Sequence, residues 1–361
     1  MRKANVAIVG CGNISSIYLE NLTGRFRNVE VTAVCDMVQE KAKAQAEKYG
    51  IPRVLSFEEI LADPSIDIVL NITTPQTHYS LCKQILEAGK HTYVEKPLSL
   101  TYEQGKELVE LAREKNLLIG CAPDTFLGAG IQTCRRIIDS GVIGEIIGAT
   151  AFMTCHGHES WHPDPEFYYK RGGGPMFDMG PYYLTALVNL VGSADSVAAM
   201  TSIPAPTRTI TSQPKFGQTI EVEVPTHVNG LIRFSNGAIG NIITSFDVWG
   251  SSLPRIEIYG KRGCMIVPDP NCFDGQILVK QAFDTEFKSW PMMTQDSVNS
   301  RGIGLSDMAD RILCGRESHR ASGDIALHVL EIMEAIHVSS DEKAQVKLTS
   351  TCQRPEKMPI I

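Results

Sequence analysis

Short apolar runs separated by helical segments organise the first third of the chain. Each run is four to six residues long, and one intervening segment opens with the helix-capping sequence Ser56-Phe-Glu-Glu59. Strands that alternate with helices in this way are typical of α/β proteins. The pattern therefore predicts a doubly wound parallel sheet, with strands at residues 6–9, 29–34, 66–70, 91–94 and 117–121.

The pattern changes after residue 123, where longer β-rich stretches predominate. Asn236-Gly237 separates two of them and predicts a hairpin. Residues 203–218 are rich in Pro, Thr and Ser and are predicted to form an irregular loop. The predicted strands are residues 145–155, 196–202, 221–234, 238–246 and 255–259, and the predicted helices are residues 130–139, 304–314 and 324–339.

Composition narrows the class of protein. The chain has 361 residues, enough for two domains, and its formal charge of −7 disfavours a general binder of nucleic acid or anionic membranes. No apolar stretch approaches the ~20 residues that span a bilayer, and the N-terminal run is too short for a signal peptide. The ten cysteines are scattered without a Cys-x-x-Cys pair. These features predict reduced thiols in a cytoplasmic protein.

A glycine-rich turn follows the first predicted strand. Gly10 permits a tight turn, and Gly12 permits close approach of a pyrophosphate to a helix N-terminus. Ser15 replaces the third glycine of the usual fingerprint, and Asp36 ends the next strand, where it can accept ribose hydroxyls. An acidic residue there favours NAD over NADP. A glycine pair in a nucleotide-free α/β domain is the alternative.

Several chemically useful side chains follow the predicted strands at their carboxyl ends. Ligands of doubly wound sheets gather beyond these ends. Glu95-Lys96-Pro97 follows one strand, and its lysine is placed for proton chemistry beside a hydride acceptor. The residues predicted to bind the cofactor are Gly10, Gly12, Asn13, Ile14, Asp36, Thr73, Thr74, Pro75, His78, Glu95 and Lys96.

The ordered motifs resemble the glucose–fructose oxidoreductase/inositol dehydrogenase (Gfo/Idh/MocA) family. They are the glycine turn, Thr73-Thr-Pro-Gln-Thr-His78, Glu95-Lys96-Pro97 and the segment Gly172–Tyr183. The resemblance implies a Rossmann domain at residues 1–123. It also implies an α+β domain at residues 124–361 with a large, open, mainly antiparallel sheet. Nicotinamide chemistry on sugars and polyols, a cis Lys96–Pro97 bond and a homodimer or homotetramer are implied as well.

Lys96, Asp178 and Tyr182 are the predicted catalytic residues. Lys96 would hydrogen-bond the reacting oxygen, and Asp178 and Tyr182 would share one face of a helix as an i, i+4 pair. Most relatives have histidine where Tyr182 stands. A free tyrosine is a poor base at neutral pH, but a neighbouring ammonium lowers its pKa, so we expect Tyr182 to exchange protons in partnership with Lys96. The structural alternatives are that Asp178 braces the helix and that Tyr182 packs.

A histidine-rich segment provides the predicted substrate-binding residues. Imidazoles hydrogen-bond sugar hydroxyls, and an exposed tryptophan can stack on a pyranose ring. His156 and His158 would share a face if the preceding strand extended that far. Zinc binding and structural packing are the alternatives, and we predict no metal. The predicted residues are His156, His158, Trp161, His162 and Tyr183.

Three functions remain open at this point. The first is an NAD-dependent dehydrogenase or reductase acting on a sugar, glycoside or polyol. The second is a redox-neutral enzyme whose tightly held NAD oxidises a sugar carbon transiently, and the third is a non-catalytic NAD-dependent sensor. The predicted partner is a small-molecule carbohydrate substrate, with neither nucleic acid nor membrane.

Overall fold

The chain folds into two compact units. The computed structural model describes residues 2–316 and 318–360. The first unit extends to Gly128 and also contains Asp296–Leu330, and the second comprises Ala129–Gln295 and the chain from Glu331 onward. Within the described residues, no helix combines the length and apolarity needed to cross a membrane.

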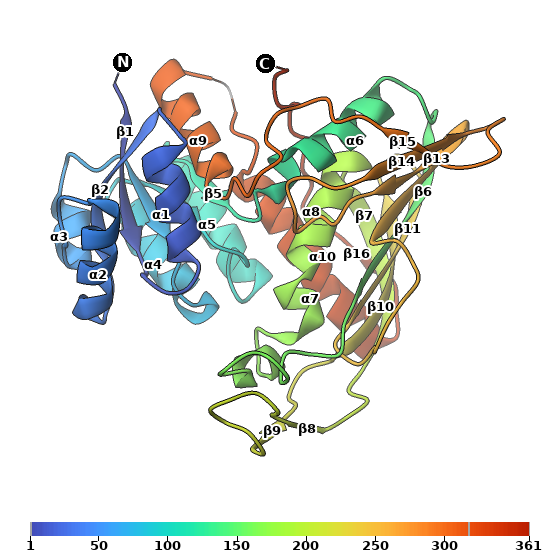
Figure 1. The fold of residues 1–361 in the computed structure, drawn as a ribbon, viewed down its shortest axis with the longest axis horizontal. Coiled ribbons are helices and arrows are strands. Elements are labelled where there is room, and N and C mark those ends of the chain that lie inside the picture. Colours follow the sequence, from blue (N-terminus) through green and yellow to red (C-terminus); the bar gives the residue numbers. More distant parts are fainter. Residues whose placement is uncertain (1, 317, 361) are drawn as a thin grey trace. The chain divides into compact units, whose positions relative to one another are not determined.

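The first unit contains the predicted doubly wound sheet (Figure 1). Its strands are all parallel, in the order β2-β1-β3-β4-β5. Because β1 has β2 on one side and β3 on the other, the chain changes direction of winding between β1 and β3, where such sheets bind ligands. The strands are β1 (Ala4–Val9), β2 (Val29–Cys35), β3 (Ile68–Asn71), β4 (His91–Val94) and β5 (Ile119–Cys121). The helices are α1 (Ser15–Gly24), α2 (Gln39–Tyr49), α3 (Phe57–Ala62), α4 (Pro75–Glu87), α5 (Tyr102–Glu114) and α9 (Ile303–Cys314).

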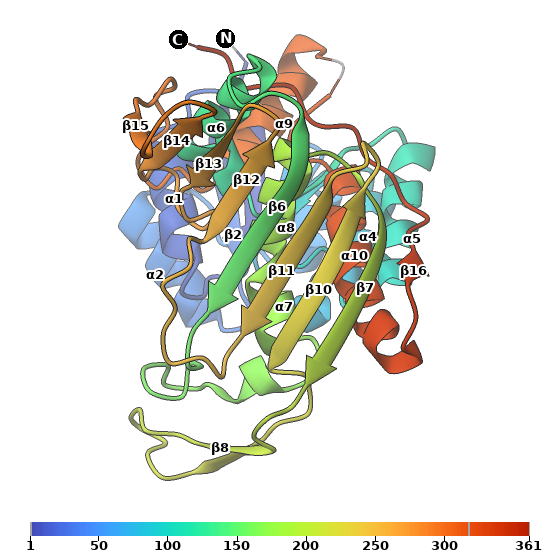
Figure 2. The same cartoon turned by 90° about the vertical axis from the view of Figure 1, so that its right-hand side faces the viewer.

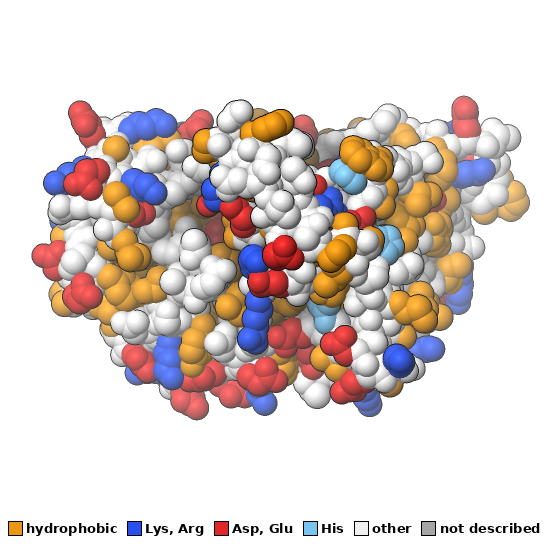
Figure 3. Space-filling model, turned by 90° about the horizontal axis from the view of Figure 1, so that it is seen from below, with side chains coloured by type: hydrophobic (Ala, Val, Ile, Leu, Met, Phe, Trp, Pro, Cys, Tyr) orange, Lys and Arg blue, Asp and Glu red, His pale blue; other side chains and the backbone are white. Residues whose placement is uncertain are grey.

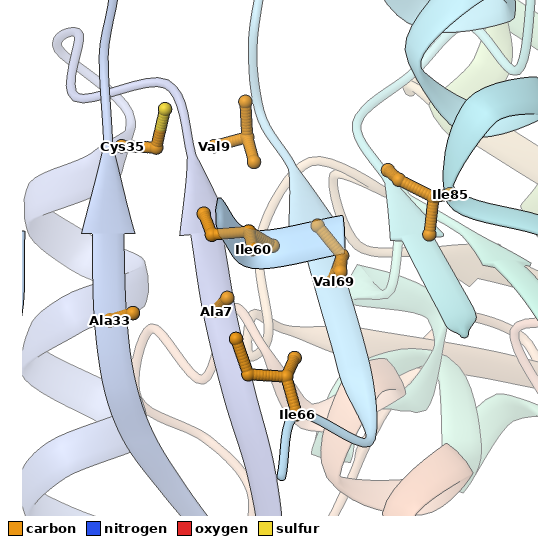
Figure 4. Close-up of a cluster of buried hydrophobic side chains, with 8 residues drawn as sticks. All are labelled: Ala7, Val9, Ala33, Cys35, Ile60, Ile66, Val69 and Ile85. Atoms are coloured by element: carbon orange, nitrogen blue, oxygen red, sulfur yellow. The ribbon is translucent and has the colours of Figure 1, made fainter. Parts of the chain in front are cut away.

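A cluster of small and branched side chains fixes one face of this sheet. Alternate residues of a strand point to the same face, so Ala7 and Val9 of β1 lie beside Ala33 and Cys35 of β2 (Figure 4). Ile60 of α3 packs over them. The predicted capping box is confirmed at the start of α3, where the side chain and backbone of Ser56 bond reciprocally with those of Glu59.

A segment late in the chain returns to the first unit. Residues 296–330 pack with the first unit, although the sequence assigned them to the second. Buried Asp124 accepts hydrogen bonds from the backbone amides of Gly302 at 2.8 Å and Gly304 at 3.0 Å. The periodicity of a helix such as α9 shows that one face is buried but does not identify the core that the face covers.

The second unit is built on a large mixed sheet (Figure 2). Nine strands of the described chain pair in the order β15-β14-β13-β12-β6-β11-β10-β7-β16, and every pair except β6 with β11 is antiparallel. The strands are β6 (Ile146–Thr154), β7 (Ala194–Ser202), β10 (His227–Phe234), β11 (Ile239–Ser245), β12 (Ile256–Gly260), β13 (Gly263–Val267), β14 (Ile277–Gln281), β15 (Lys288–Trp290) and β16 (Val346–Lys347).

One face of this sheet is covered by helices (Figures 1 and 2). Along β10 buried residues alternate with exposed ones, so Ile232 lies inward and Leu231 outward. The predicted hairpin at Asn236-Gly237 is confirmed by the antiparallel pairing of β10 with β11. The helices are α6 (Ala129–Asp139), α7 (Gly174–Asp178), α8 (Gly180–Leu190) and α10 (Gly323–Glu342), which begins in the first unit. The 3-10 turns are η1 (Thr125–Leu127), at the end of the first stretch of the first unit, and η2 (Glu166–Tyr169), in the second unit.

A small hairpin arm corrects two predictions. The stretch 221–234 was predicted as one strand, but β9 (Thr219–Glu221) ends well before β10 begins. Pro225 lies between them and has no amide hydrogen for a strand ladder. The predicted irregular loop 203–218 contains β8 (Thr207–Thr209), which pairs with β9. Strands β13–β16 were not predicted; none of them is longer than five residues.

Candidate functional site

The turn after β1 contains two glycines with different surroundings. The fold requires glycine at position 10, whereas the space around position 12 is empty. Gly10 has φ +104°, and a Cβ there would lie 2.8 Å from the carbonyl oxygen of Ile72. A Cβ on Gly12 would meet nothing within 4 Å. Asn13 and Ile14 are exposed, and the Ser15 hydroxyl closes the turn by donating to the Gly12 oxygen at 2.6 Å. The open space at Gly12 fits a pyrophosphate placed against the start of α1.

Asp36 links this turn to the end of β2. Its Oδ2 accepts a hydrogen bond from the Cys11 amide at 2.7 Å, and Oδ1 accepts one from the Val38 amide at 2.8 Å. Each carboxylate oxygen has a second lone pair, so the side chain keeps the capacity to accept ribose hydroxyls. The predicted ribose contact stays a prediction, and the bond to Cys11 is a second role that the sequence did not indicate.

The Thr73–His78 motif forms the start of α4. Thr74 is the N-cap residue and Pro75 the first helical residue, while the Thr73 hydroxyl donates to Asn71 Oδ1 at 2.7 Å. Proline is preferred at this position because its missing amide hydrogen is not needed there. The motif therefore presents a helix N-terminus at the carboxyl end of β3.

His78 joins two loops of the site, and its predicted contact with the cofactor stays a prediction. The ring is fully enclosed, with Nδ1 at 2.7 Å from the Pro97 oxygen and Nε2 at 3.2 Å from the Thr73 oxygen. Burial lowers the pKa of His78. A side chain enclosed in this way holds two loops together.

Glu95 is anchored at the end of β4. Its Oε1 accepts a hydrogen bond from Tyr18 Oη of α1 at 2.7 Å, and its Oε2 accepts one from the Lys96 amide at 3.0 Å. The cis Lys96–Pro97 bond is confirmed. Glu95 is buried and the Lys96 side chain is half-buried. The carboxylate therefore fixes the backbone from which Lys96 extends.

Asp178 and Tyr182 belong to two short helices of the second unit, so the prediction of one continuous helix is wrong. α7 ends at Asp178 and α8 begins at Gly180. Pro181 lacks the amide hydrogen that a continuous helix would use. Asp178 is half-buried, and Tyr182 is 9% exposed.

His158 contacts the Asp178 carboxylate. Its Nε2 lies 3.2 Å from Asp178 Oδ2. β6 ends at Thr154, so His156 and His158 lie in the following loop and do not share a strand face, as the sequence suggested they could. His156 stacks on Trp249, with the ring centroids 3.3 Å apart. The carboxylate contact was not predicted, because it joins segments 20 residues apart.

The remaining predicted substrate residues differ in exposure. Trp161 is 60% exposed. Its ring packs edge-on against the rings of His158 and His162, with ring centroids 5.3 Å apart in each pair. Tyr183 is 1% exposed and burial raises its pKa, so it lies in the core, and its predicted substrate contact stays a prediction. Histidine side chains lie among hydrophobic ones on the face seen in Figure 3. Within residues 2–316 and 318–360, no group of three or more His, Cys, Asp or Glu is placed to hold a metal ion.

A buried ion network holds the loop after β6. Arg208 of the hairpin arm donates to Glu159 Oε1 at 2.8 Å and also to Asp247. The Tyr169 hydroxyl donates to Glu159 as well. These contacts were not predicted, because charged residues far apart in sequence give no local signal. They fix the segment that contains His158 and Trp161.

Two family models match the chain. An oxidoreductase family with an NAD-binding Rossmann fold matches residues 4–122, and the GFO/IDH/MocA C-terminal domain matches residues 131–266. D-glucoside 3-dehydrogenase of Escherichia coli is 29% identical over 277 residues, 73% of this chain and 77% of that protein. Inositol 2-dehydrogenase/D-chiro-inositol 3-dehydrogenase of Lactiplantibacillus plantarum is 32% identical over 145 residues, 39% of this chain and 41% of that protein. The match with an uncharacterized oxidoreductase of Schizosaccharomyces pombe spans about half of that protein, 55%.

Solved structures share the fold over nearly the whole chain. Levoglucosan dehydrogenase in complex with NADH and L-sorbose has a TM-score of 0.82 and 22% identity, covering 97% of this chain and 100% of that one. Aldose-aldose oxidoreductase from Caulobacter crescentus, complexed with glycerol, has a TM-score of 0.79 and 24% identity, covering 96% of this chain and 100% of that one. At these identities the likeness establishes the architecture.

Proposed function

The chain belongs to the Gfo/Idh/MocA family of oxidoreductases, and from this premise we propose that it interconverts a secondary alcohol and a ketone on a sugar, glycoside or polyol with NAD. The carrying observation is the anchored Glu95-Lys96 pair. Tyr18 and the Lys96 amide fix the Glu95 carboxylate, so a lysine extends from a rigid strand end of the NAD-binding fold.

The first unit would hold the cofactor at its glycine turn. The open space at Gly12 accommodates a pyrophosphate, and the Asp36 carboxylate accepts ribose hydroxyls. When bound, nicotinamide supplies the hydride acceptor or donor. His78 supports the surrounding loops. The residues proposed to contact the cofactor are Gly10, Gly12, Asn13, Ile14, Asp36, Thr73, Thr74, Pro75, Glu95 and Lys96.

We propose Lys96, Asp178 and Tyr182 as the residues of proton transfer. The Lys96 ammonium stabilises negative charge that develops on the substrate oxygen. The Tyr182 hydroxyl exchanges the proton of the reacting hydroxyl group, and the Asp178 carboxylate completes the site. The sugar ring would stack on Trp161, which is 60% exposed, while His156 and His162 hydrogen-bond its hydroxyls.

Turnover by the purified protein tests this proposal. A panel of sugars, inositols and glycosides is incubated with NAD, and NADH formation is followed. We expect at least one substrate to be oxidised and NAD to be used more efficiently than NADP. Tightly retained NAD with product but no net NADH would instead indicate a redox-neutral enzyme. Binding of NAD and sugar without any product would indicate a sensor.

Two substitutions test the residues. Lys96→Ala and Tyr182→Phe are each expected to lower kcat by about 100-fold or more, the range of general acid–base catalysis. NAD affinity, measured by fluorescence titration, should change little in Tyr182→Phe. Near-full turnover in either variant would remove that residue from the mechanism.

The chain is also proposed to form a homodimer or homotetramer. Large apolar side chains are exposed on strands of the second sheet, with Met200 82%, Leu231 52% and Ile239 52% exposed. A sheet surface of this kind is suited to a subunit contact. Light scattering of the wild type and of Leu231→Lys tests it; a monomeric wild type would contradict the proposal.

A further inference from the structure

The Asp178 carboxylate stands at a break in the helical structure, between α7 and α8. α7 is only five residues long and ends at Asp178 itself. The backbone hydrogen bonds of α7 do not fix this side chain, so the orientation of the carboxylate depends on the side chains around it. His158 is such a neighbour, with Nε2 3.2 Å from Asp178 Oδ2.

The hydrogen-bonding needs of both groups determine which nitrogen of His158 carries the proton. An ionised carboxylate only accepts hydrogen bonds, so Nε2 must be the donor in this pair. Nδ1 is buried and has no hydrogen-bond partner among the described residues. A buried polar atom left without a partner is costly and calls for a functional explanation. The hydrogen bond from Nε2 to Asp178 is therefore the one that the ring makes among the described residues.

The imidazole ring is held in place from several sides. It is 9% exposed and packs against Tyr168 and Phe246, with centroids 4.0 and 4.6 Å away. The backbone amide of His158 faces Tyr169 Oη at 3.3 Å. The next residue, Glu159, is pinned by the buried Arg208. A ring fixed in this way can impose an orientation on a less rigid partner.

We propose that His158 is the positioning residue of the active site and fixes the Asp178 carboxylate by a hydrogen bond from Nε2. The inference rests on the proposed dehydrogenase function, in which Asp178 takes part in proton transfer. The histidine proposed for the active site thus lies in the loop after β6. Position 182 of α8, where most relatives have histidine, is a tyrosine. His158 acts through Asp178 and does not need to touch the substrate.

Two substitutions separate the hydrogen bond from the packing. His158→Phe keeps an aromatic ring against Tyr168 and Phe246 but removes the donor, and we expect kcat to fall about tenfold or more with little change in the KM for NAD. His158→Gln retains an amide donor, and its kcat should recover to within about threefold of the wild type. Equal loss in both variants, or a kcat for His158→Phe within about twofold of the wild type, would overturn the proposal.

His337→Phe is the matched control. The His337 ring also packs against α7, 5.7 Å from Phe177, and its Nε2 is buried without a hydrogen-bond partner among the described residues. The same substitution there changes a half-buried histidine beside the same helix without removing a donor to Asp178. We expect its kcat to stay within about twofold of the wild type. Thermal unfolding of all three variants checks that they fold.

A spectroscopic readout keeps the test independent of turnover. Long-range proton–nitrogen NMR at neutral pH is expected to show the Nε2–H tautomer of His158, and Asp178→Ala should increase exchange of that proton. The Nδ1–H tautomer, or an Nε2 signal that is unchanged in Asp178→Ala, would overturn the inference. A wild type that turns over no substrate would refute the proposed function, and the tautomer would still decide whether His158 bonds to Asp178.

Discussion

Asp36 Oδ2 accepts a hydrogen bond from the Cys11 amide at 2.7 Å, so the residue after β2 holds the turn that follows β1. The same carboxylate is proposed to bind the adenosine ribose. Its charge also repels a 2′-phosphate, which disfavours NADP.

Asp36→Asn tests both roles. The variant keeps an oxygen acceptor but loses the charge, so we expect the preference for NAD over NADP, measured as the ratio of kcat/KM values, to fall about tenfold or more. Asp67→Asn is the control, because Asp67 also accepts a backbone amide hydrogen bond, from Asn5, at the opposite end of the strands. An unchanged ratio in Asp36→Asn would contradict the ribose contact.

The two glycines of the turn give opposite predictions. Gly10→Ala forces a side chain into a left-handed conformation and against Ile72, so it should lower the free energy of unfolding by more than about 1 kcal/mol. Gly12→Ala meets open space and should leave stability unchanged, while the dissociation constant for NAD rises about tenfold. Thermal unfolding and NAD titration of both variants check this. Unaltered NAD binding in Gly12→Ala would place the pyrophosphate elsewhere.

The sequence predicted the βαβ core because local signals and tertiary structure agree there. Apolar runs fit buried parallel strands, and a glycine with positive φ fits a tight turn. Asp178 and Tyr182 were placed on one helix because their spacing of four fits a helical turn. The signal against it, Pro181, was already in the sequence.

Contacts between distant segments could not be predicted in this way. Two examples are the hydrogen bond between His158 and Asp178 and the ion pairs of Arg208. Both depend on the tertiary arrangement of loops that are distant in sequence. A buried ion pair leaves no periodic pattern in the sequence. A single sequence also provides no covariation between positions from which a contact could be inferred. The assignment of α9 to the first unit was missed for the same reason.

Asp124 should give the first unit a pH-dependent stability. Burial raises its pKa from 3.8 to about 6, although the amides of Gly302 and Gly304 oppose the shift. The folded chain therefore binds this proton more tightly than the unfolded chain, and stability falls as pH rises between these two values. Relative to Asp124→Asn, the free energy of unfolding should fall by about 1.4 kcal/mol per pH unit in that window. Urea titrations from pH 4 to about 7 measure it; a constant difference would contradict the prediction.

Arg208 should be essential for the stability of the second unit. Its side chain is 6% exposed and bonds to the carboxylates of Glu159 and Asp247, whose side chains are 9% and 15% exposed. Arg208→Met leaves those charges uncompensated and should lower the free energy of unfolding by about 3–5 kcal/mol. Lys261→Met breaks an ion pair with Glu145 in which the side chains are 60% and 70% exposed, and it should cost below about 1 kcal/mol. Equal effects in urea titrations would refute the distinction.

The packing of residues 296–330 with the first unit affects how that unit can fold during translation. The amides that satisfy Asp124 are 178 and 180 residues further along the chain. A nascent chain that has emerged only to Gly128 has a buried carboxylate site without donors and a β5 edge without its bridge to Ser322. We therefore expect the first unit to remain incomplete on the ribosome until residues 296–330 have been translated, although residues up to Gly128 are made well before them.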